Sequence, residues 1–507
     1  MSDARFLRFA HGDVIPRAGV PRIDVAAFNT AVAESVASGH RLVTLFGHPA
    51  GKDFIELMAI LANDRDGELS VAATAVAGSY PALTPGCPQA HWFEREIAEQ
   101  WAVTPEGHPW LKPIRFHQPY RPGASPWQRT GETPAQPGIT NYFRVEGREI
   151  HEVAVGPVHA GIIEPGHFRF QCHGENVFNL EIELGYQHRG IERRIRGGPD
   201  NRTIHYMETA GGDTTVGHAM AYCHLMEALG RVRVPARAQV LRGVALELER
   251  LANHTGDLGA LAGDIGYLPT ASFCGRIRGD WLNLTATMCG NRFGRGLIRP
   301  GGLGNEPDAE CLKNILCRLD AFERDMAGAV ELLWATTSVM ARLEETGVVS
   351  QADAISIGLV GPAARACGLS RDVRNDFPSG IYRYANIPPA SWHSGDVFAR
   401  AFVRWVESQR SIAFIREQLG TLPTGAVAVA SGRIAPDAMA VSLVEGWRGE
   451  ICHVALTDSN GRFEHYKVSD PSFHNWYGLA LALRNQQISD FPLCNKSFNL
   501  SYCGHDL

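Results

Sequence analysis

The chain has 507 residues, 45% of them hydrophobic and 20% charged, and carries a formal net charge of −6. This composition is ordinary for a globular protein, and it excludes a disordered chain, a collagen and a polytopic membrane protein. The length predicts about two to four domains. The slight excess of acidic residues argues against a nucleic-acid binder, which needs a basic face to neutralise phosphates.

Targeting signals and disulfide patterns are also missing from the sequence. No apolar run approaches the roughly eighteen residues that a membrane-spanning helix requires, and Met1–Arg5 lacks the apolar core of a signal peptide. Eleven cysteines at irregular spacing do not form a disulfide framework and fit a reducing compartment. We therefore expect a cytoplasmic chain that does not itself span a membrane.

The first part of the chain, residues 1–116, has the pattern of a small α/β domain. Hydrophobic periodicity predicts, in order, a helix, a strand, a β-hairpin and a second helix, over residues 24–38, 41–46, 54–76 and 90–99. The hairpin turn is predicted at Asn63–Gly67, where turn-forming residues cluster. Prolines and glycines then recur, so residues 117–144 are predicted to form a linker.

The remainder, residues 145–507, changes its pattern twice. Short alternating runs predict an antiparallel sheet within residues 145–190, and the region from about 205 to 420 is mainly helical. Its long helices are predicted over residues 237–263, 307–346 and 396–419. Strands are predicted after them, over residues 425–431, 450–456 and 462–468. The predicted fold class is α+β, with a helical bundle between antiparallel β segments.

Short motifs give little chemistry by themselves. The chain has no Cys-x-x-Cys motif, which argues against zinc ribbons and most iron-sulfur sites. Gly47–Asp53 has one residue too few for a phosphate loop and lacks its hydroxyl residue, so a solvated turn is predicted. Cysteine and histidine stand together four times and would bind a metal only if they converged: Cys172–His173, Cys223–His224, Cys452–His453 and Cys503–His505.

Two polar patterns have both a structural and a functional interpretation. Arg292, Arg295 and Arg299 lie in a glycine-rich loop, which is either an ordinary surface loop or a site for an anion or a nearby reduced cluster. On the helix predicted over residues 237–263, four ionisable residues share one face: Glu247, Arg250, His254 and Asp257. A solvated face would be unremarkable, whereas a covered face would be a candidate proton route.

Longer motifs carry a family resemblance. Gly156–His159, Glu164–Phe170, Gly185–Glu192 and Asn495–Leu500 resemble the large subunit of membrane-bound nickel-iron hydrogenases of the formate hydrogenlyase type. They also resemble the homologous catalytic-arm subunit of respiratory complex I. Upstream, Phe93–Glu96 with Gly107–Pro109 resembles the small α/β subunit of complex I, which formate hydrogenlyase-type enzymes fuse in this order. The resemblance implies a fold like that of a nickel-iron hydrogenase large subunit.

The resemblance also shows what this chain lacks. Family hydrogenases hold nickel and iron with two Cys-x-x-Cys motifs. Alignment places Gly211 and Thr214 at the cysteine positions of the first motif, and Ser501 and Gly504 at those of the second. Neither glycine nor a neutral hydroxyl replaces a thiolate ligand. We therefore expect no metal and no cofactor bound by this chain, and a cavity lined by these four positions.

Several residues around that position match functional residues of the family. Arg448 matches an arginine over the active site, Glu164 and Glu192 match carboxylates of proton transfer, and Asp213 adds a carboxylate beside the vacated site. In complex I a histidine and a tyrosine hold the quinone head group. His159 or His167 is a candidate for the histidine, but the tyrosine position falls at Gly212. Quinone binding is therefore open.

The functional expectation is a peripheral-arm subunit of a membrane-bound, complex I-like or hydrogenase-like oxidoreductase. The resemblance implies an iron-sulfur small subunit and antiporter-like membrane subunits as partners, with the chain held at the cytoplasmic face of the inner or plasma membrane through them. It would receive electrons from the partner's cluster and couple the redox step to proton translocation. The alternatives are a redox-inactive subunit that organises the complex or transmits conformational change and, less favoured, a true nickel-iron hydrogenase.

Overall fold

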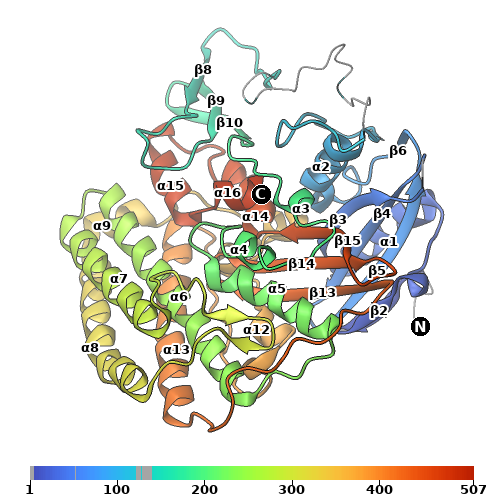
Figure 1. The fold of residues 1–507 in the computed structure, drawn as a ribbon. Helices are drawn as coiled ribbons and strands as arrows, with labels where there is room; N and C mark the ends of the chain where they lie inside the picture. The colour runs from blue at the N-terminus through green and yellow to red at the C-terminus, as the bar shows by residue number, and fades with distance from the viewer. Residues whose placement is uncertain (1–4, 52, 122–126, 128–136, 138–139) are drawn as a thin grey trace.

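The computed structural model describes residues 5–51, 53–121, 127, 137 and 140–507. Two four-stranded antiparallel sheets, a bundle of long helices and a smaller three-stranded sheet make up the molecule (Figure 1). Most of the predicted linker, residues 117–144, lies outside the described residues. The α+β class is confirmed.

The N-terminal sheet has the strand order β1-β5-β4-β3, with bounds Leu7–Ala10, Glu68–Val76, Ile55–Asn63 and Arg41–Pro49. The predicted hairpin is confirmed, because β4 and β5 pair from Asn63↔Glu68 onward. Helices α1 (Val25–Ala37) and α2 (His91–Trp101) also lie where periodicity predicted them. The Asp24 carboxylate accepts a hydrogen bond from the Ala26 amide and so begins α1.

The C-terminal sheet has the strand order β15-β14-β13-β2, with bounds Phe463–Ser469, Gly449–Thr457, Ala438–Gly446 and Val14–Pro16. The strand predicted over residues 425–431 was wrong, since only an isolated bridge from Ala428 to Gly302 forms there. Strand β13 was missed. All of its residues are buried, so the alternation that marks a half-exposed strand is absent.

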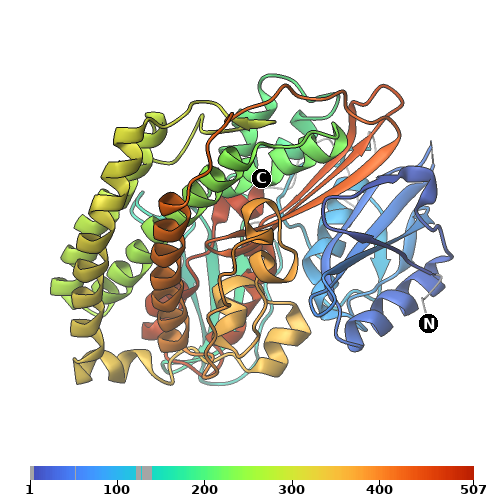
Figure 2. The ribbon, with the colours of Figure 1, turned by 90° about the horizontal axis from the view of Figure 1, so that it is seen from below.

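The two four-stranded sheets share a hydrophobic core. Phe9, Val43 and Phe46 of the N-terminal sheet belong to the same buried cluster as Val441 and Leu443 of the C-terminal sheet. A buried ion pair also joins the sheets, because Arg41 Nη1 lies 2.6 Å from Glu450 Oε1. Figure 2 shows the C-terminal sheet between the N-terminal domain and the helices.

Five long helices form the helical part: α5, α6, α7, α8 and α13, with bounds Thr215–Leu229, Ala236–Asp264, Leu268–Cys289, Ala309–Trp334 and Val397–Gly420. The single helix predicted over residues 307–346 was wrong. It ends at Trp334, Thr336 adopts extended backbone, and α9 (Thr337–Leu343) follows. The Thr336 hydroxyl bonds to the Leu332 carbonyl and to Tyr267, and these contacts hold the break.

The third sheet confirms the antiparallel prediction for residues 145–190. Its order is β10-β9-β8, with bounds Asn176–Glu183, His167–His173 and Ile150–Val155. Near the C-terminus, α14, α15 and α16 span Pro471–Ala482, Phe491–Phe498 and Tyr502–Asp506. The remaining helices and strands are short: β6 Ser79–Pro81, β7 Thr104–Glu106, α3 Ile191–Arg194, α4 Thr203–Met207, β11 Ile298–Arg299, β12 Gly302–Leu303, α10 Gln351–Ile357, α11 Gly361–Ala366 and α12 Val373–Asp376, with 3-10 turns at Arg17–Gly19, Pro88–Ala90, Gly380–Arg383 and Ile488–Asp490.

Candidate functional site

The four positions aligned with metal-binding cysteines come together around one carboxyl group, that of Asp470. A Cβ atom added at Gly504 would lie 2.7 Å from Asp470 Cγ, and one added at Gly211 would lie 3.6 Å from Asp470 Oδ2 and 3.4 Å from Thr214 Cβ. Ser501 begins α16 by accepting a hydrogen bond from the Gly504 amide at 2.9 Å. The Asp470 carboxyl thus fills space between the two glycines.

Asp213 and Arg448 form the charged edge of this cluster. The carboxylate accepts two hydrogen bonds from the guanidinium, one of them from Nη2 at 2.8 Å. Arg448 also donates to the Thr214 hydroxyl at 3.3 Å and lies over the Trp447 ring at 3.9 Å. Arg448 is buried, whereas the Asp213 side chain is 34% exposed, so the pair reaches from the interior towards solvent.

Glu164 joins the cluster from the loop between β8 and β9. Its carboxylate accepts hydrogen bonds from the Tyr502 and Cys503 amides, each at 3.3 Å, which are the first amides of α16. Burial and the neighbouring Glu164 charge raise the pKa of the Cys503 thiol to about 11. Cys503 is therefore a protonated thiol near neutral pH, and its sulfur accepts from the Gly212 amide at 3.3 Å.

Three predicted site residues lie outside this cluster. Glu192 accepts from the Val468 amide at 2.9 Å and lies 3.1 Å from Lys467 Nζ, between α3 and β15. His159 pairs with the Gly166 carbonyl at 2.9 Å, and His167 lies 3.4 Å from the Gly156 carbonyl. Both histidines thus bind backbone of the β8–β9 loop rather than Asp213, Arg448 or Asp470.

A chain of buried side chains that the sequence did not reveal runs from Asp470 into the C-terminal sheet. His218 Nε2 lies 3.0 Å from Asp470 Oδ2, and His218 Nδ1 lies 3.1 Å from His453 Nε2. His453 Nδ1 lies 2.8 Å from the Tyr466 hydroxyl. One set of proton positions satisfies every contact: Tyr466 donates to His453, His453 to His218, and His218 to the Asp470 carboxylate.

The electrostatics agree with that assignment. Burial would raise the pKa of Asp470, but the hydrogen bond from His218 and the charge of Arg448 hold it below its ordinary value. Burial and the adjacent His218 hold the pKa of His453 well below its ordinary value. The neutral ring of His453 therefore accepts a hydrogen bond from the Tyr466 hydroxyl and donates one to His218.

Glu249 is a second residue that sequence reasoning missed. Its carboxyl accepts from the Val216 and Gly217 amides at 2.7 and 3.1 Å and so caps the first turn of α5. Burial, with a smaller contribution from the Asp213 charge, raises its pKa to about 8. It is therefore an exchangeable carboxyl close to the Asp213–Arg448 pair.

The ionisable face of α6 is covered by α13 rather than by solvent. His254 Nε2 lies 2.8 Å from Glu407, and Asp257 accepts from Arg404 Nε at 2.8 Å. Glu247 pairs with Arg250 and Arg374, and a hydroxyl of Tyr382 donates to it at 2.8 Å. The face is therefore part of a buried ionic network. This covered arrangement is the one that makes it a candidate proton route.

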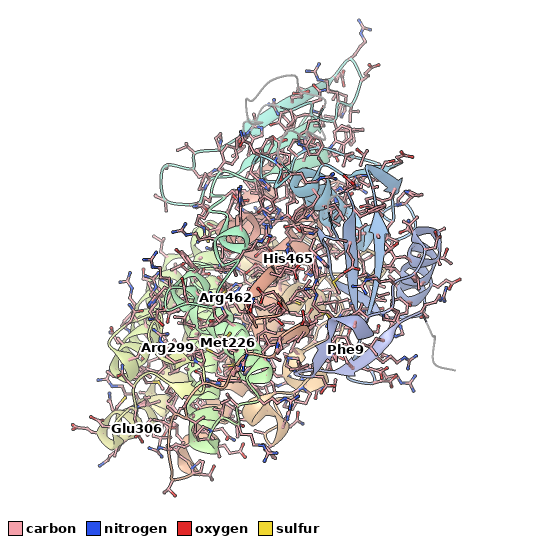
Figure 3. All side chains as sticks on the ribbon, turned by 45° about the vertical axis from the view of Figure 1, so that its right-hand side comes forward. Phe9, Met226, Arg299, Glu306, Arg462 and His465 are labelled. Carbon is pink, nitrogen blue, oxygen red and sulfur yellow. The ribbon has the colours of Figure 1, made fainter. Side chains whose placement is uncertain are left out.

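The arginine-rich loop is partly built into the fold. Arg299 donates to Glu208 Oε1 at 2.6 Å, and Figure 3 shows it on the helical side of the molecule. Arg292 and Arg295 are exposed. The loop thus combines one structural arginine with two on the surface.

Other sequence motifs form no site. Within the described ranges, no cluster of three or more histidine, cysteine or acidic side chains is arranged to hold a metal ion. The phosphate-loop-like segment differs from the predicted turn, because Gly47–Pro49 continue β3 and the turn is closed by the Ala50 amide and the Phe54 carbonyl. Lys52 lies outside the described residues.

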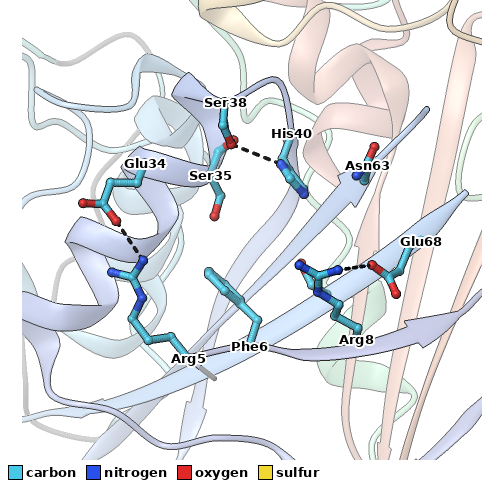
Figure 4. Close-up of a pocket in the computed structure, with 10 residues that line it drawn as sticks. Arg5, Phe6, Arg8, Glu34, Ser35, Ser38, His40, Asn63 and Glu68 are labelled. Carbon is cyan, nitrogen blue, oxygen red and sulfur yellow. Dashed lines mark hydrogen bonds and ion pairs between the residues drawn. The ribbon is translucent and has the colours of Figure 1, made fainter. Parts of the chain in front are cut away.

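Cavities away from this cluster differ in character. A shallow one of about 300 Å³ lies beside β1 and α1 (Figure 4), where Arg5 pairs with Glu34 and Arg8 with Glu68. Another, of about 740 Å³, lies between α5, α6 and the 379–384 loop. The charged groups at the first are already paired, and none of the residues aligned with the family's active site lines either cavity.

Comparison with known proteins identifies the family. The model of the 30 Kd subunit of respiratory-chain NADH dehydrogenase matches residues 23–135, and that of the 49 Kd subunit matches residues 264–439. The carbon monoxide-induced hydrogenase of Rhodospirillum rubrum is 31% identical over 350 residues, which make up 69% of this chain and 97% of that protein. The chain belongs to the family of complex I 49 Kd and membrane-bound hydrogenase large subunits.

Other members of the family extend the comparison. Hydrogenase-4 component G of Escherichia coli (strain K12) is 28% identical over 435 residues, covering 83% of this chain and 75% of that protein. A chain of the archaeal membrane-bound sulfane sulfur reductase shares the fold, with a TM-score of 0.67, 21% identity and coverage of 71% of this chain and 99% of that one. Family membership supports a role as a peripheral-arm subunit of a complex I-like or hydrogenase-like membrane complex. Of the helices in the described ranges, none is both long and apolar enough to cross a bilayer.

Proposed function

We propose that this chain receives electrons from an iron-sulfur cluster in a partner small subunit and passes them to an acceptor without a nickel-iron centre. The step is coupled to proton movement, with Glu164, Glu192 and Arg448 as participants. The chain is held at the cytoplasmic face of the membrane through antiporter-like partners. Asp213 and Arg448 mark the point where the buried cluster reaches solvent and where an acceptor would enter.

The position of the Asp470 carboxyl is the observation that carries this proposal. A cysteine at position 504 would place its Cβ 2.7 Å from Asp470 Cγ and 2.9 Å from Ser501 Oγ, closer than such contacts occur. The residues present are two glycines, a threonine and a serine, which offer none of the soft anionic donors of a nickel-iron centre. These residues do not fit the metal group of the related hydrogenases.

The hydrogen-bonded chain from Asp470 to Tyr466 supports the coupling to protons. Reduction of an organic acceptor adds negative charge that protons must neutralise, and a buried site needs a route for them. Asp470, His218 and His453 form contiguous hydrogen bonds of about 3 Å at this position. Glu164, in the β8–β9 loop, accepts from the Cys503 amide and would serve the same role on that side of the cluster.

Quinones are one candidate class of acceptor. The complex I pair of a histidine and a tyrosine is incomplete here, because the tyrosine position holds Gly212 and both candidate histidines bind loop backbone. A quinone head group would have to use other donors, and the Arg448 guanidinium beside Asp213 is one of them. The proposed acceptor class therefore includes quinones without being restricted to them.

The experiment uses the complex purified intact through a tag on this chain. Metal analysis is expected to find iron from partner clusters but no stoichiometric nickel, and turnover is measured with a short-chain quinone and with protons as acceptors. Arg448→Lys and Asp213→Asn are expected to lower turnover at least tenfold, whereas Arg416→Gln, which removes a surface arginine paired with Asp320, leaves it unchanged.

Two outcomes would overturn the proposal. Finding one nickel per complex would identify the chain as the subunit of a true nickel-iron hydrogenase. Unchanged turnover and growth in both site variants, with the complex assembled, would instead favour a redox-inactive subunit that organises the complex.

A further inference from the structure

An apolar cavity of about 600 Å³ lies away from the Asp470 cluster, between the N-terminal domain and the three-stranded sheet. Helix α2, strand β10 and helix α14 contribute its walls, so segments far apart in the sequence enclose it. The volume falls within the range of about 300–1,000 Å³ that small-molecule sites occupy. None of the predicted site residues lines it.

Aromatic side chains dominate the walls: Trp92, Trp110, Phe143, Trp476 and Tyr477. Phe143 is 46% exposed and Tyr477 36% exposed, although large apolar side chains are usually covered. Flat aromatic walls favour a flat, mainly apolar ligand, because rings gain from stacking beyond the burial of their area.

One wall residue, Arg95, is a buried cation without a carboxylate partner. It is only 3% exposed, and no acidic side chain of the described chain lies within ion-pair distance of it. Its Nε and Nη2 donate to the carbonyls of Lys112 and Pro113 at 2.9 and 2.7 Å, and its guanidinium lies 4.7 Å from the centre of the Trp92 ring. Within the described residues, Nη1 makes no hydrogen bond.

Glu181 lines the cavity, and its charge, with those of Glu183 and Glu99, stabilises the Arg95 cation from beyond ion-pair distance. Lys112 Nζ lies 2.9 Å from Glu183, and it also pairs with Glu181, to which the Trp110 indole donates at 2.7 Å. Burial lowers the pKa of Arg95 to about 10, so the group remains charged at neutral pH. A buried guanidinium whose direct contacts are carbonyl groups is still costly, and an anionic oxygen beside Nη1 would lower that cost.

We propose that this cavity binds a flat, mainly apolar molecule carrying one anionic oxygen group, such as an aromatic carboxylate or sulfonate. Its rings stack against the indoles of Trp92 and Trp110, and its anionic oxygen accepts from Arg95 Nη1. The site is separate from the Asp213–Arg448 pair, so this proposal does not depend on the redox function.

The test compares two fluorescent probes that differ by one charged group. The sulfonate 1-anilinonaphthalene-8-sulfonate and its neutral counterpart N-phenyl-1-naphthylamine are titrated into the purified complex, and energy transfer from tryptophan reports binding. We expect one sulfonate probe per chain in this site. Arg95→Gln should weaken the sulfonate about tenfold or more and the neutral probe less than about twofold, because only the sulfonate loses a charge-assisted hydrogen bond. Arg95→Lys should fall between.

A filling variant makes the test independent of Arg95. Ala480 lines the cavity, so Ala480→Trp should abolish the binding of both probes. Its control is Glu331→Trp on the exposed face of α8, which adds a tryptophan elsewhere and should leave binding unchanged. Equal losses of both probes in Arg95→Gln, or unaltered binding in Ala480→Trp, would refute the proposal. So would probe binding that occurs in the isolated chain and disappears in the complex, since a partner would then cover the cavity.

Discussion

Replacing Gly504 by alanine measures directly how tightly the Asp470 carboxyl fills the vacated position. In a helix, glycine to alanine ordinarily stabilises a protein by about 0.5–1 kcal/mol. Here the new Cβ would lie 2.7 Å from Asp470 Cγ and 2.9 Å from Ser501 Oγ. Overpacking of this kind costs about 1–3 kcal/mol, so we expect a net loss of about 1–2 kcal/mol and a lower unfolding temperature.

The matched control is Gly328→Ala in α8, where an added Cβ meets no heavy atom within 4 Å. That variant should raise the unfolding temperature, so the two alanines should shift it in opposite directions. In an Asp470→Ala background the cost of Gly504→Ala should fall by about 1 kcal/mol or more, which a double-mutant cycle measures. If Gly504→Ala is as harmless as Gly328→Ala, the Asp470 carboxyl does not fill this space and the argument against a metal centre loses its basis.

Three further predictions concern charge and protons. Asp213→Asn should destabilise the chain by about 1–3 kcal/mol, because the buried Arg448 loses its counter-ion, and thermal unfolding at pH 7 checks this. Burial raises the pKa of Glu445 to about 7, so the native state binds an extra proton and wild-type stability falls as pH rises from about 4.5 to 7. Between pH 4.5 and 7 the free energy of unfolding of Glu445→Gln should fall by up to about 3 kcal/mol less than that of the wild type. Equal pH dependence of the two proteins would contradict the shifted pKa. Tyr466→Phe should leave His453 Nδ1 without its donor, at a cost of about 1–3 kcal/mol, and shift the His453 nitrogen resonances in NMR spectra.

Local patterns were enough to predict several of the helices and the hairpin of β4 and β5. The turn at Asn63–Gly67, the helix that became α6 and the sheet within residues 145–190 all have their signals inside a few neighbouring residues. The failures came from tertiary contacts. Strand β13 is buried on both faces and shows no period, and the Thr336 hydroxyl at the break bonds to Tyr267, which lies just before α7.

The candidate site divides in the same way. The family resemblance was needed to select Gly211, Thr214, Ser501 and Gly504, and the structure brings them together. The Asp470–Pro471 pair was readable as a helix start, since aspartate before proline is a typical N-terminal signal. The contact between Asp470 and His218 could not be predicted from the sequence, because 252 residues separate the two.

A buried ionic network lies behind the site, between α6, α12, α13 and β13. Four carboxylates, Glu247, Asp372, Glu407 and Glu445, meet only three arginines, Arg250, Arg365 and Arg374. One negative charge is therefore in excess when all are ionised, and a single proton restores the balance. Glu445, with a pKa of about 7, is the group that takes it.

That proton lies close to the proposed acceptor position. His254, paired with Glu407, meets the Trp447 ring edge-on at 6.3 Å between centroids, and the Trp447 indole donates to the Asp213 carbonyl at 3.1 Å. Negative charge arriving beside Arg448 would raise the proton affinity of the network, because charges in a poorly solvated interior interact strongly. Glu445, with a pKa of about 7, is the group of that network that would take up the proton. Under the proposed function, electron arrival at the site would be coupled to proton uptake by this network.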